Sequence, residues 1–122
     1  MTWSYSQSTG KLRHDGVMVT IGYSGNGKGL NNPNDQAIHY VGPIPQGLWD
    51  IGAMAADGGH MGPNVLPLTP AAGTDTFGRD AFFIHGDNDK VNHTASEGCI
   101  IIRPDIRDQI AQSGDAVLEV TA

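Results

Sequence analysis

The sequence predicts a mostly-β single domain spanning residues 1–122, built from short strands with one or two short helices. A chain of 122 residues has the length of one domain and can bury about two-thirds of its unfolded surface without disulfide bonds. Its 17 glycines and 7 prolines make about a fifth of the chain, which favours many turns over long helices. The apolar segments are short, with no internal repeat and no low-complexity tail.

The N-terminal segment has the pattern of a β-hairpin. Trp3 and Tyr5 alternate with serine, which is typical of a strand with one buried face. Residues 8–10, Ser-Thr-Gly, supply a turn, and residues 17–23 form the return strand or its extension. Residues 24–35 are polar and rich in Gly and Asn, which predicts a long loop.

The middle of the chain is expected to combine two strands with irregular structure. Residues 36–42 predict a short strand, and a second strand around Trp49 follows a rigid Pro-x-Pro segment. Residues 55–80 are rich in Gly and Pro, which predicts an irregular excursion. A loop of that length in a small domain is usually functional or mobile.

The C-terminal part contains two buried strands, the one clear helix and a closing strand. Residues 81–86, AFFIHG, predict a strand that ends on His85, and the β-branched segment 99–103 predicts another. Residues 103–114, RPDIRDQIAQSG, predict a helix, with Pro in the first turn, isoleucines at i and i+4, and a glycine stop. Residues 116–122, AVLEVTA, read as a final strand.

Composition and charge exclude two classes of partner. The net charge is −6 and the seven basic residues are scattered, whereas nucleic-acid binding relies on clusters of Lys and Arg. No apolar stretch approaches the roughly 20 residues of a membrane span. The first residues are polar and lack a basic segment followed by an apolar stretch. We therefore expect a protein made in the cytoplasm without a secretory signal peptide.

Residues 22–29, GYSGNGKG, match only the beginning of a phosphate-binding loop. Gly29 stands where that loop has the Ser or Thr that holds Mg²⁺. The loop should also begin a helix, and the turn-forming sequence Leu-Asn-Asn-Pro follows instead. We interpret the segment as a surface loop and expect no nucleotide.

Several side chains are of a type that binds metal ions, but their spacing matches no zinc pattern such as H-E-x-x-H or C-x-x-C. These candidates are His60, His85, Asp87, Asp89, His93 and Cys99. We predict no metal and no cofactor, and keep a metal-dependent amidase as an alternative.

Cys99 is the only cysteine and cannot form an internal disulfide. A free thiol has a pKa of about 8.5, and a neighbouring imidazolium lowers that pKa. His85 ends a buried strand and Cys99 begins one, and active sites gather at such positions. The amides of Gly98 and Cys99 are candidates to face an oxyanion. From these residues alone, a Cys–His catalytic pair and a buried inert cysteine both remain open.

The segment 84–102, IHGDNDKVNHTASEGCIII, resembles the signature of the L,D-transpeptidase (YkuD-like) family. That signature is a strand ending in His-Gly, a spacer, and Ser-His-Gly-Cys followed by aliphatic residues. Residues 42–52, GPIPQGLWDIG, resemble the family's upstream Thr-Pro-x-Gly-x-aromatic-x-Ile segment. The form Ser-Glu-Gly-Cys, with YSGNGKG, GPIPQG and HGDN, is closest to the L,D-transpeptidase-like effectors of bacterial type VI secretion systems. The resemblance covers residues 23–110 and implies one L,D-transpeptidase-like β-sandwich or barrel.

The resemblance implies roles for named residues. Cys99 is the nucleophile, His85 is its base, and the Gly86 carbonyl orients the histidine. Ser96 and Gly98 keep their places in the motif. The substrate-binding candidates are Glu97, Asp87, Arg103 and Arg79. Two departures concern substrate anchoring: Glu97 replaces the usual histidine, and Ile101 replaces the usual Arg or Asn, so that Arg103 is the nearest arginine. An ion pair with Asp105 is the alternative for Arg103.

The implied reaction is thioester chemistry on peptidoglycan stem peptides, at the bond between meso-diaminopimelate and D-alanine. Water gives carboxypeptidase action and an amine gives exchange, and we expect the 55–80 loop to control that choice. The resemblance also implies a toxin secreted into the target-cell periplasm and guarded by an immunity protein. A non-catalytic cell-wall binding module with the same fold remains the main alternative.

Overall fold

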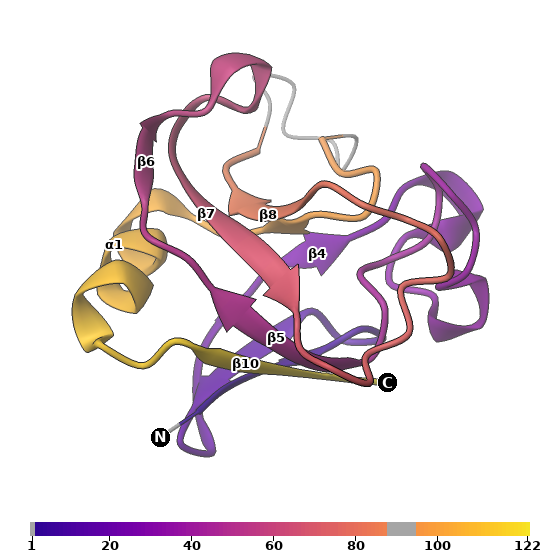
Figure 1. Ribbon diagram of the computed structural model, residues 1–122, viewed down its shortest axis with the longest axis horizontal. Helices are drawn as coiled ribbons and strands as arrows, with labels where there is room; N and C mark the ends of the chain where they lie inside the picture. The colour runs from indigo at the N-terminus through magenta and orange to yellow at the C-terminus, as the bar shows by residue number, and fades with distance from the viewer. Residues whose placement is uncertain (1, 88–94) are drawn as a thin grey trace.

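The computed structural model describes residues 2–87 and 95–122, and most of its regular structure is β (Figure 1). One α-helix, α1, covers Pro104–Ser113, and short 3-10 turns cover Gly27–Gly29 (η1), Pro33–Asp35 (η2) and Gly59–Met61 (η3). The strands are β1 Trp3–Ser6, β2 Lys11–His14, β3 Val17–Ile21, β4 Tyr23–Ser24, β5 Gly47–Ile51, β6 Ala55–Asp57, β7 Pro63–Pro70, β8 Phe82–His85, β9 Ile100–Ile101 and β10 Val117–Thr121. The predicted mostly-β fold class with a short helix is confirmed. No helix among the described residues is long and apolar enough to cross a membrane.

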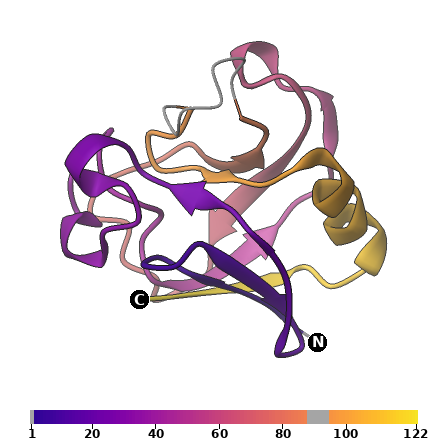
Figure 2. The same cartoon turned by 180° about the vertical axis from the view of Figure 1, so that it is seen from behind.

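The strands form a sheet that curls almost into a barrel (Figures 1 and 2). Its order is β3-β2-β1-β10-β5-β7-β8-β9-β4, with β6 paired to β7. The two end strands, β3 and β4, are separated in the chain only by Gly22. The sheet therefore has to bend back on itself for one short link to join its two ends. Within the described residues, β1–β10 and β8–β9 are the parallel pairs.

The core follows the alternation of apolar residues along the strands. Trp49 is fully buried, donates its indole N–H to the Pro45 carbonyl (3.0 Å) and meets the Phe82 ring edge-on at 4.9 Å. Ile106 and Ile110 bury one face of α1, which packs against β7 and β8. The core cluster comprises Trp3, Tyr5, Leu12, Ile44, Trp49, Leu66, Leu68, Phe82, Ile84, Ile100, Ile102, Ile106, Ile110, Leu118 and Val120.

Two predicted segments differ from the structure near the N-terminus. The expected hairpin is a three-stranded meander, because a second turn at Asp15–Gly16 separates β2 from β3. Residues 36–42 are a series of turns, so the strand predicted there is wrong. The Gly42 amide donates to the Ile38 carbonyl, and Tyr40 has a left-handed φ of +64°, which is incompatible with a strand.

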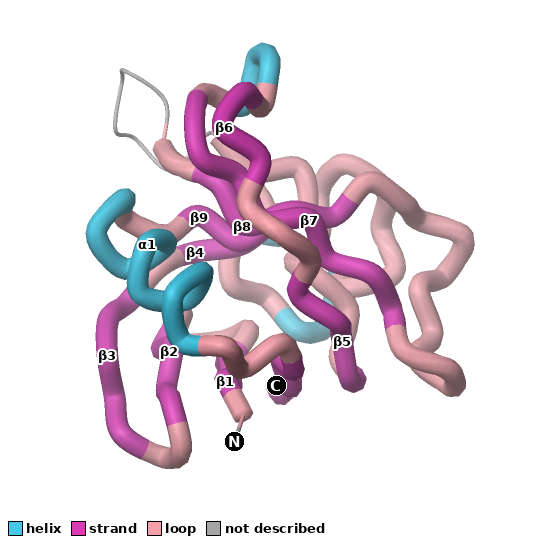
Figure 3. Tube along the Cα trace, turned by 60° about the vertical axis from the view of Figure 1, so that its left-hand side comes forward, coloured by secondary structure: helices cyan, strands magenta, loops and turns pink. Residues whose placement is uncertain are grey.

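The irregular structure predicted for residues 55–80 is wrong for the three residues of β6 and the eight residues of β7. Prolines at 63, 67 and 70 gave the segment the appearance of a loop. Pro67 nevertheless lies between β5 and β8, where its carbonyl accepts from the Gly52 amide (2.8 Å). Figure 3 shows the β6–β7 hairpin, with η3 at its tip, projecting beyond β8.

Candidate active site

The ends of β8 and β9 bring His85 and Cys99 to one face of the sheet. The two strands run parallel, with Ile84 opposite Ile100, so Cys99 lies across from Phe83. Because side chains alternate along a strand, Cys99, Phe83 and His85 share a face. Ile84 and Ile100 point the other way and are fully buried in the core.

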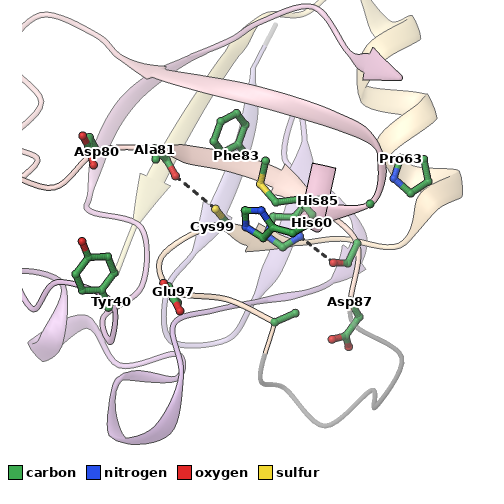
Figure 4. A pocket seen from close by; sticks show the side chains of 14 residues that line it. Tyr40, His60, Pro63, Asp80, Ala81, Phe83, His85, Asp87, Glu97 and Cys99 are labelled. Atoms are coloured by element: carbon green, nitrogen blue, oxygen red, sulfur yellow. Dashed lines mark hydrogen bonds between the residues drawn. The ribbon is translucent and has the colours of Figure 1, made fainter. Parts of the chain in front are cut away.

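That face opens into a cavity of about 740 Å³. Figure 4 shows Cys99 on the wall of this cavity, which is also lined by His85 and His60. Of the predicted site residues, Cys99, His85, Gly86, Asp87 and Glu97 line this cavity. The full lining is Tyr40, His60, Met61, Gly62, Pro63, Asp80, Ala81, Phe83, His85, Gly86, Asp87, Ala95, Glu97 and Cys99.

The His85 ring is held in one tautomer by its own neighbour. Its Nδ1 lies 2.8 Å from the Gly86 carbonyl, which can only accept, so Nδ1 carries the proton and Nε2 is left as an acceptor. Burial lowers the pKa of His85 below its usual 6.5, and the charge of Arg107 acts in the same direction. The Gly86 carbonyl and Asp87 oppose this shift of the pKa without reversing it. His85 is therefore a neutral imidazole at neutral pH.

The Cys99 thiol is also neutral. Burial raises its pKa to about 11, and the Glu97 carboxylate adds to that increase, while the Phe83 amide and Arg79 oppose it. Its Sγ contacts the Ala81 carbonyl at 3.6 Å. The sequence suggested a thiolate paired with an imidazolium. The structure instead favours a neutral thiol beside a neutral imidazole, because burial disfavours both charged forms.

Ser96 shapes the turn before the cysteine and is fully buried. Its Oγ donates to the Cys99 carbonyl (2.6 Å) and accepts from the amides of Gly25 (2.9 Å) and Gly98 (3.1 Å). The Gly98 amide is thus paired inside the turn, which corrects the expectation that it faces an oxyanion. Ser96 therefore holds the Cys99 backbone in place.

Arg79 is part of the scaffold, which corrects its prediction as a substrate anchor. It is only 6% exposed, and its guanidinium lies 5.2 Å from the centre of the Phe82 ring. It donates to backbone carbonyls of two separate loops, so it has no free face for a ligand. These acceptors are Gln36, Gly42, Pro43 and Glu97.

Gly98 is required beneath that guanidinium, and replacing it by alanine should destabilise the fold by about 2–4 kcal/mol. Its φ is +132°, and an added Cβ would overlap Arg79 Nη2 and lie 3.2 Å from the Phe82 ring. Denaturant unfolding of Gly98→Ala measures the loss. Gly16→Ala is the matched control, because Gly16 has φ +83° with nothing within 4 Å, so its cost is limited to about 1 kcal/mol of backbone strain. Equal losses in the two variants would contradict the steric account.

Arg103 lies outside the cavity lining and is exposed, and its Nε pairs with Asp105 at 2.6 Å. Its prediction as a substrate-binding residue is therefore corrected in favour of the ion pair. Asp87 does line the cavity, and its carboxylate accepts from the Tyr23 hydroxyl (2.7 Å). Burial and this bond raise the pKa of Tyr23. Glu97 is exposed at the cavity.

The sequence analysis missed two basic residues that lie near His85 and Cys99. His60 was considered only as a metal ligand, yet it lines the cavity from η3. Arg107 of α1 is buried and lies beside Gly86, where an added Cβ would be 3.0 Å from its Nη2. Its position three residues after Pro104 gave no sign of this, because helical periodicity marks only Ile106 and Ile110 as buried.

Neither the partial phosphate-binding motif nor the set of metal-ligand candidates forms a site within the described residues. Residues 22–29 contain the short strand β4 and the 3-10 turn η1 in place of a helix, and Gly29 packs against the Val41 carbonyl. Among residues 2–87 and 95–122, the three side chains close enough to share a metal ion are His14, Asp15 and Asp115, which do not line the cavity. Asp89 and His93, two of the predicted metal-ligand candidates, lie outside the described residues.

Comparison with known proteins identifies the family to which the chain belongs. No curated protein matches the chain. The profile of the Tlde1 domain, a domain of type VI secretion effectors, matches residues 19–119, which is most of the chain and includes every described cavity residue. The chain therefore belongs to the Tlde1 domain family of type VI secretion effectors.

Proposed function

We propose that this Tlde1 domain is a cysteine enzyme that removes or exchanges the terminal D-alanine of peptidoglycan stem tetrapeptides. One observation carries the proposal: the thiol of Cys99 and the unprotonated Nε2 side of His85 share a cavity of about 740 Å³. A toxin delivered by a type VI system would meet this substrate in the target-cell periplasm. A protein that blocks the cavity would serve as its immunity partner.

The first half-reaction forms a thioester. As substrate binds, His85 Nε2 takes the proton from the Cys99 thiol, and the sulfur attacks the carbonyl carbon of diaminopimelate. We assign the Cys99 amide to the resulting oxyanion, since the Gly98 amide donates to Ser96 Oγ. The carbon–nitrogen bond then breaks, and the imidazolium returns its proton to the amine of D-alanine.

The second half-reaction regenerates the enzyme. His85 takes a proton from water or from an incoming amine, which attacks the thioester carbonyl, and the thiol leaves protonated. Water gives a tripeptide, and a D-amino acid gives an exchanged tetrapeptide. The part of the 55–80 segment that reaches the cavity, residues 60–63 and Asp80, would govern access of these acceptors.

Incubation of the pure protein with tetrapeptide muropeptides tests the proposal. Mass spectrometry should show loss of D-alanine in buffer and its replacement when another D-amino acid is added in excess. Unchanged tetrapeptides under both conditions would contradict the proposal.

The pH dependence of kcat/KM provides a second check. The reaction needs neutral His85, whose pKa is lowered by burial, so protonation removes the base only below pH 6.5. We expect kcat/KM to stay level from neutral pH down past 6.5 and then to fall about tenfold per unit as His85 gains a proton. An acid limb with its midpoint above pH 7 would show that the base is not a buried neutral imidazole.

A non-catalytic cell-wall binding module is the second candidate, and the raised thiol pKa favours it. With a pKa of about 11, only about one thiol in ten thousand is ionised at pH 7. Both candidates therefore predict slow labelling of Cys99 by iodoacetamide at neutral pH, rising towards pH 11. An assay with tetrapeptide substrate distinguishes the two candidates. The enzyme releases D-alanine and stops doing so after its thiol is alkylated at high pH, whereas the binding module releases none before or after alkylation.

A further inference from the structure

The charges at the cavity pose a problem for a substrate that ends in a carboxylate. The acidic side chains among the described lining residues are Asp80, Asp87 and Glu97. The nearest guanidinium groups, Arg79 and Arg107, donate to backbone carbonyls and are buried. Of the described lining residues, only the two histidines can supply a positive charge or a side-chain N–H to an anion.

His85 is occupied on both sides of its ring. Its Nδ1–H donates to Gly86, and the proposed function assigns Nε2 to the thiol proton. That leaves His60, which is exposed on η3 and lines the same cavity as His85 and Cys99 (Figure 4). The charge on His60 also lowers the pKa of His85, in keeping with this proximity.

The loop that carries His60 is closed tightly by its own backbone. The Gly58 amide donates to the Gly62 carbonyl (2.9 Å), and the Gly62 amide returns to the Gly59 carbonyl (3.1 Å). Asp57 Oδ1 accepts from the Gly59 amide at 2.9 Å. Gly59 and Gly62 have φ of +62° and +85°, which glycine adopts without strain. The His60 backbone is thus held in a defined place at the tip of the β6–β7 hairpin.

Arg107 fixes that hairpin relative to the catalytic pair. Its Nη1 donates to the carbonyls of Pro63 (3.0 Å) and Asn64 (3.1 Å), immediately after the His60 loop. The same guanidinium packs against Gly86, the residue that orients His85. One buried side chain therefore sets the spacing between the two histidines.

We propose that His60 binds the C-terminal carboxylate of the substrate and so makes the enzyme selective for peptides with a free terminal carboxylate. The inference rests on the proposed function. A ring N–H of His60 donates to the carboxylate of the terminal D-alanine, while that residue's amide nitrogen lies at the thiol of Cys99. Among the described lining residues, the acidic side chains would repel the same carboxylate, whereas the His60 ring offers it an N–H donor.

The test compares two synthetic stem tetrapeptides, one ending in D-alanine and one in D-alaninamide. The wild-type protein should prefer the free acid at least about tenfold in kcat/KM, the scale of one hydrogen bond to a charged group. His60→Ala should lose about tenfold on the acid, chiefly through KM, and stay within about twofold on the amide. His60→Gln, which keeps a side-chain N–H donor, should fall between. Met18→Ala, which is exposed on β3 and lies outside the cavity lining, should keep the preference.

Binding to the Cys99→Ala protein gives a readout that does not need turnover. Calorimetry should show tighter binding of the acid than of the amide, and no such difference in the double variant Cys99→Ala, His60→Ala. A preference that survives in His60→Ala overturns the inference, as does an equal loss on both peptides. Lack of turnover of either peptide by the wild-type protein counts against the proposed function instead, and the binding comparison still decides the role of His60.

Discussion

Replacing Cys99 by serine should lower the rate of D-alanine release by about four orders of magnitude while leaving the fold intact. The hydroxyl replaces the thiol with almost the same shape and can keep the contact that Sγ makes with the Ala81 carbonyl. It is a far weaker acid than the thiol, however, so proton transfer to His85, whose pKa is lowered by burial, is much less favourable from the hydroxyl. Removal of a nucleophile typically costs this much because the remaining groups act only through it.

The measurement is single-turnover release of D-alanine together with the mass of the intact protein. Wild-type protein mixed with substrate and quenched with acid should gain the mass of an acyl tripeptide, and Cys99→Ser should gain none. His85→Ala should slow the same step and also prevent the adduct from accumulating. Met18→Ala is the control, because Met18 is an exposed strand residue outside the cavity and its replacement should leave both the rate and the adduct unchanged. Full activity of Cys99→Ser would exclude covalent catalysis at this residue.

Local sequence was sufficient to place His85 and Cys99 at one end of neighbouring strands, because each residue adjoins an apolar segment. The apolar segments before His85 and after Cys99 predict buried strands, and the structure pairs those strands side by side. The same local reasoning fixed α1, whose Gly114 adopts a left-handed φ of +75° just after its last turn. Features that depend on a few neighbouring residues were thus accessible.

Features that depend on backbone far away in the sequence could not be predicted. Arg79 has no sequence neighbour that indicates burial, and its acceptors on the 36–43 loop are supplied only by the tertiary fold. β7 was missed for a related reason: its prolines disfavour a strand locally, and only pairing with β5 and β8 compensates. The electrostatics of Cys99 were also inaccessible, because burial of the thiol is a property of the assembled cavity wall.

Replacing Arg79 by methionine should lower the free energy of unfolding by about 3–5 kcal/mol, or the Tm by about 10–20 °C. Methionine fills much of the volume but donates no hydrogen bond. Arg79 donates to four carbonyls, and the variant leaves those in the interior without a partner. Arg79→Lys should recover little, because a single ammonium cannot reach acceptors spread from residue 36 to residue 97.

Urea unfolding followed by tryptophan fluorescence measures this loss, since Trp49 lies against the same Phe82 ring that Arg79 covers. Arg103→Ala is the matched control: it removes an exposed arginine with one ion pair, so its effect should stay within about 0.5 kcal/mol. The Arg79 bond to the Glu97 carbonyl also fixes the turn that leads into Cys99. Activity of Arg79→Met should therefore fall even well below its melting temperature, whereas Arg103→Ala keeps its rate. A change in stability below 1 kcal/mol for Arg79→Met would mean that the carbonyls find other donors, and that the two loops are held together by Phe82 and its apolar neighbours instead.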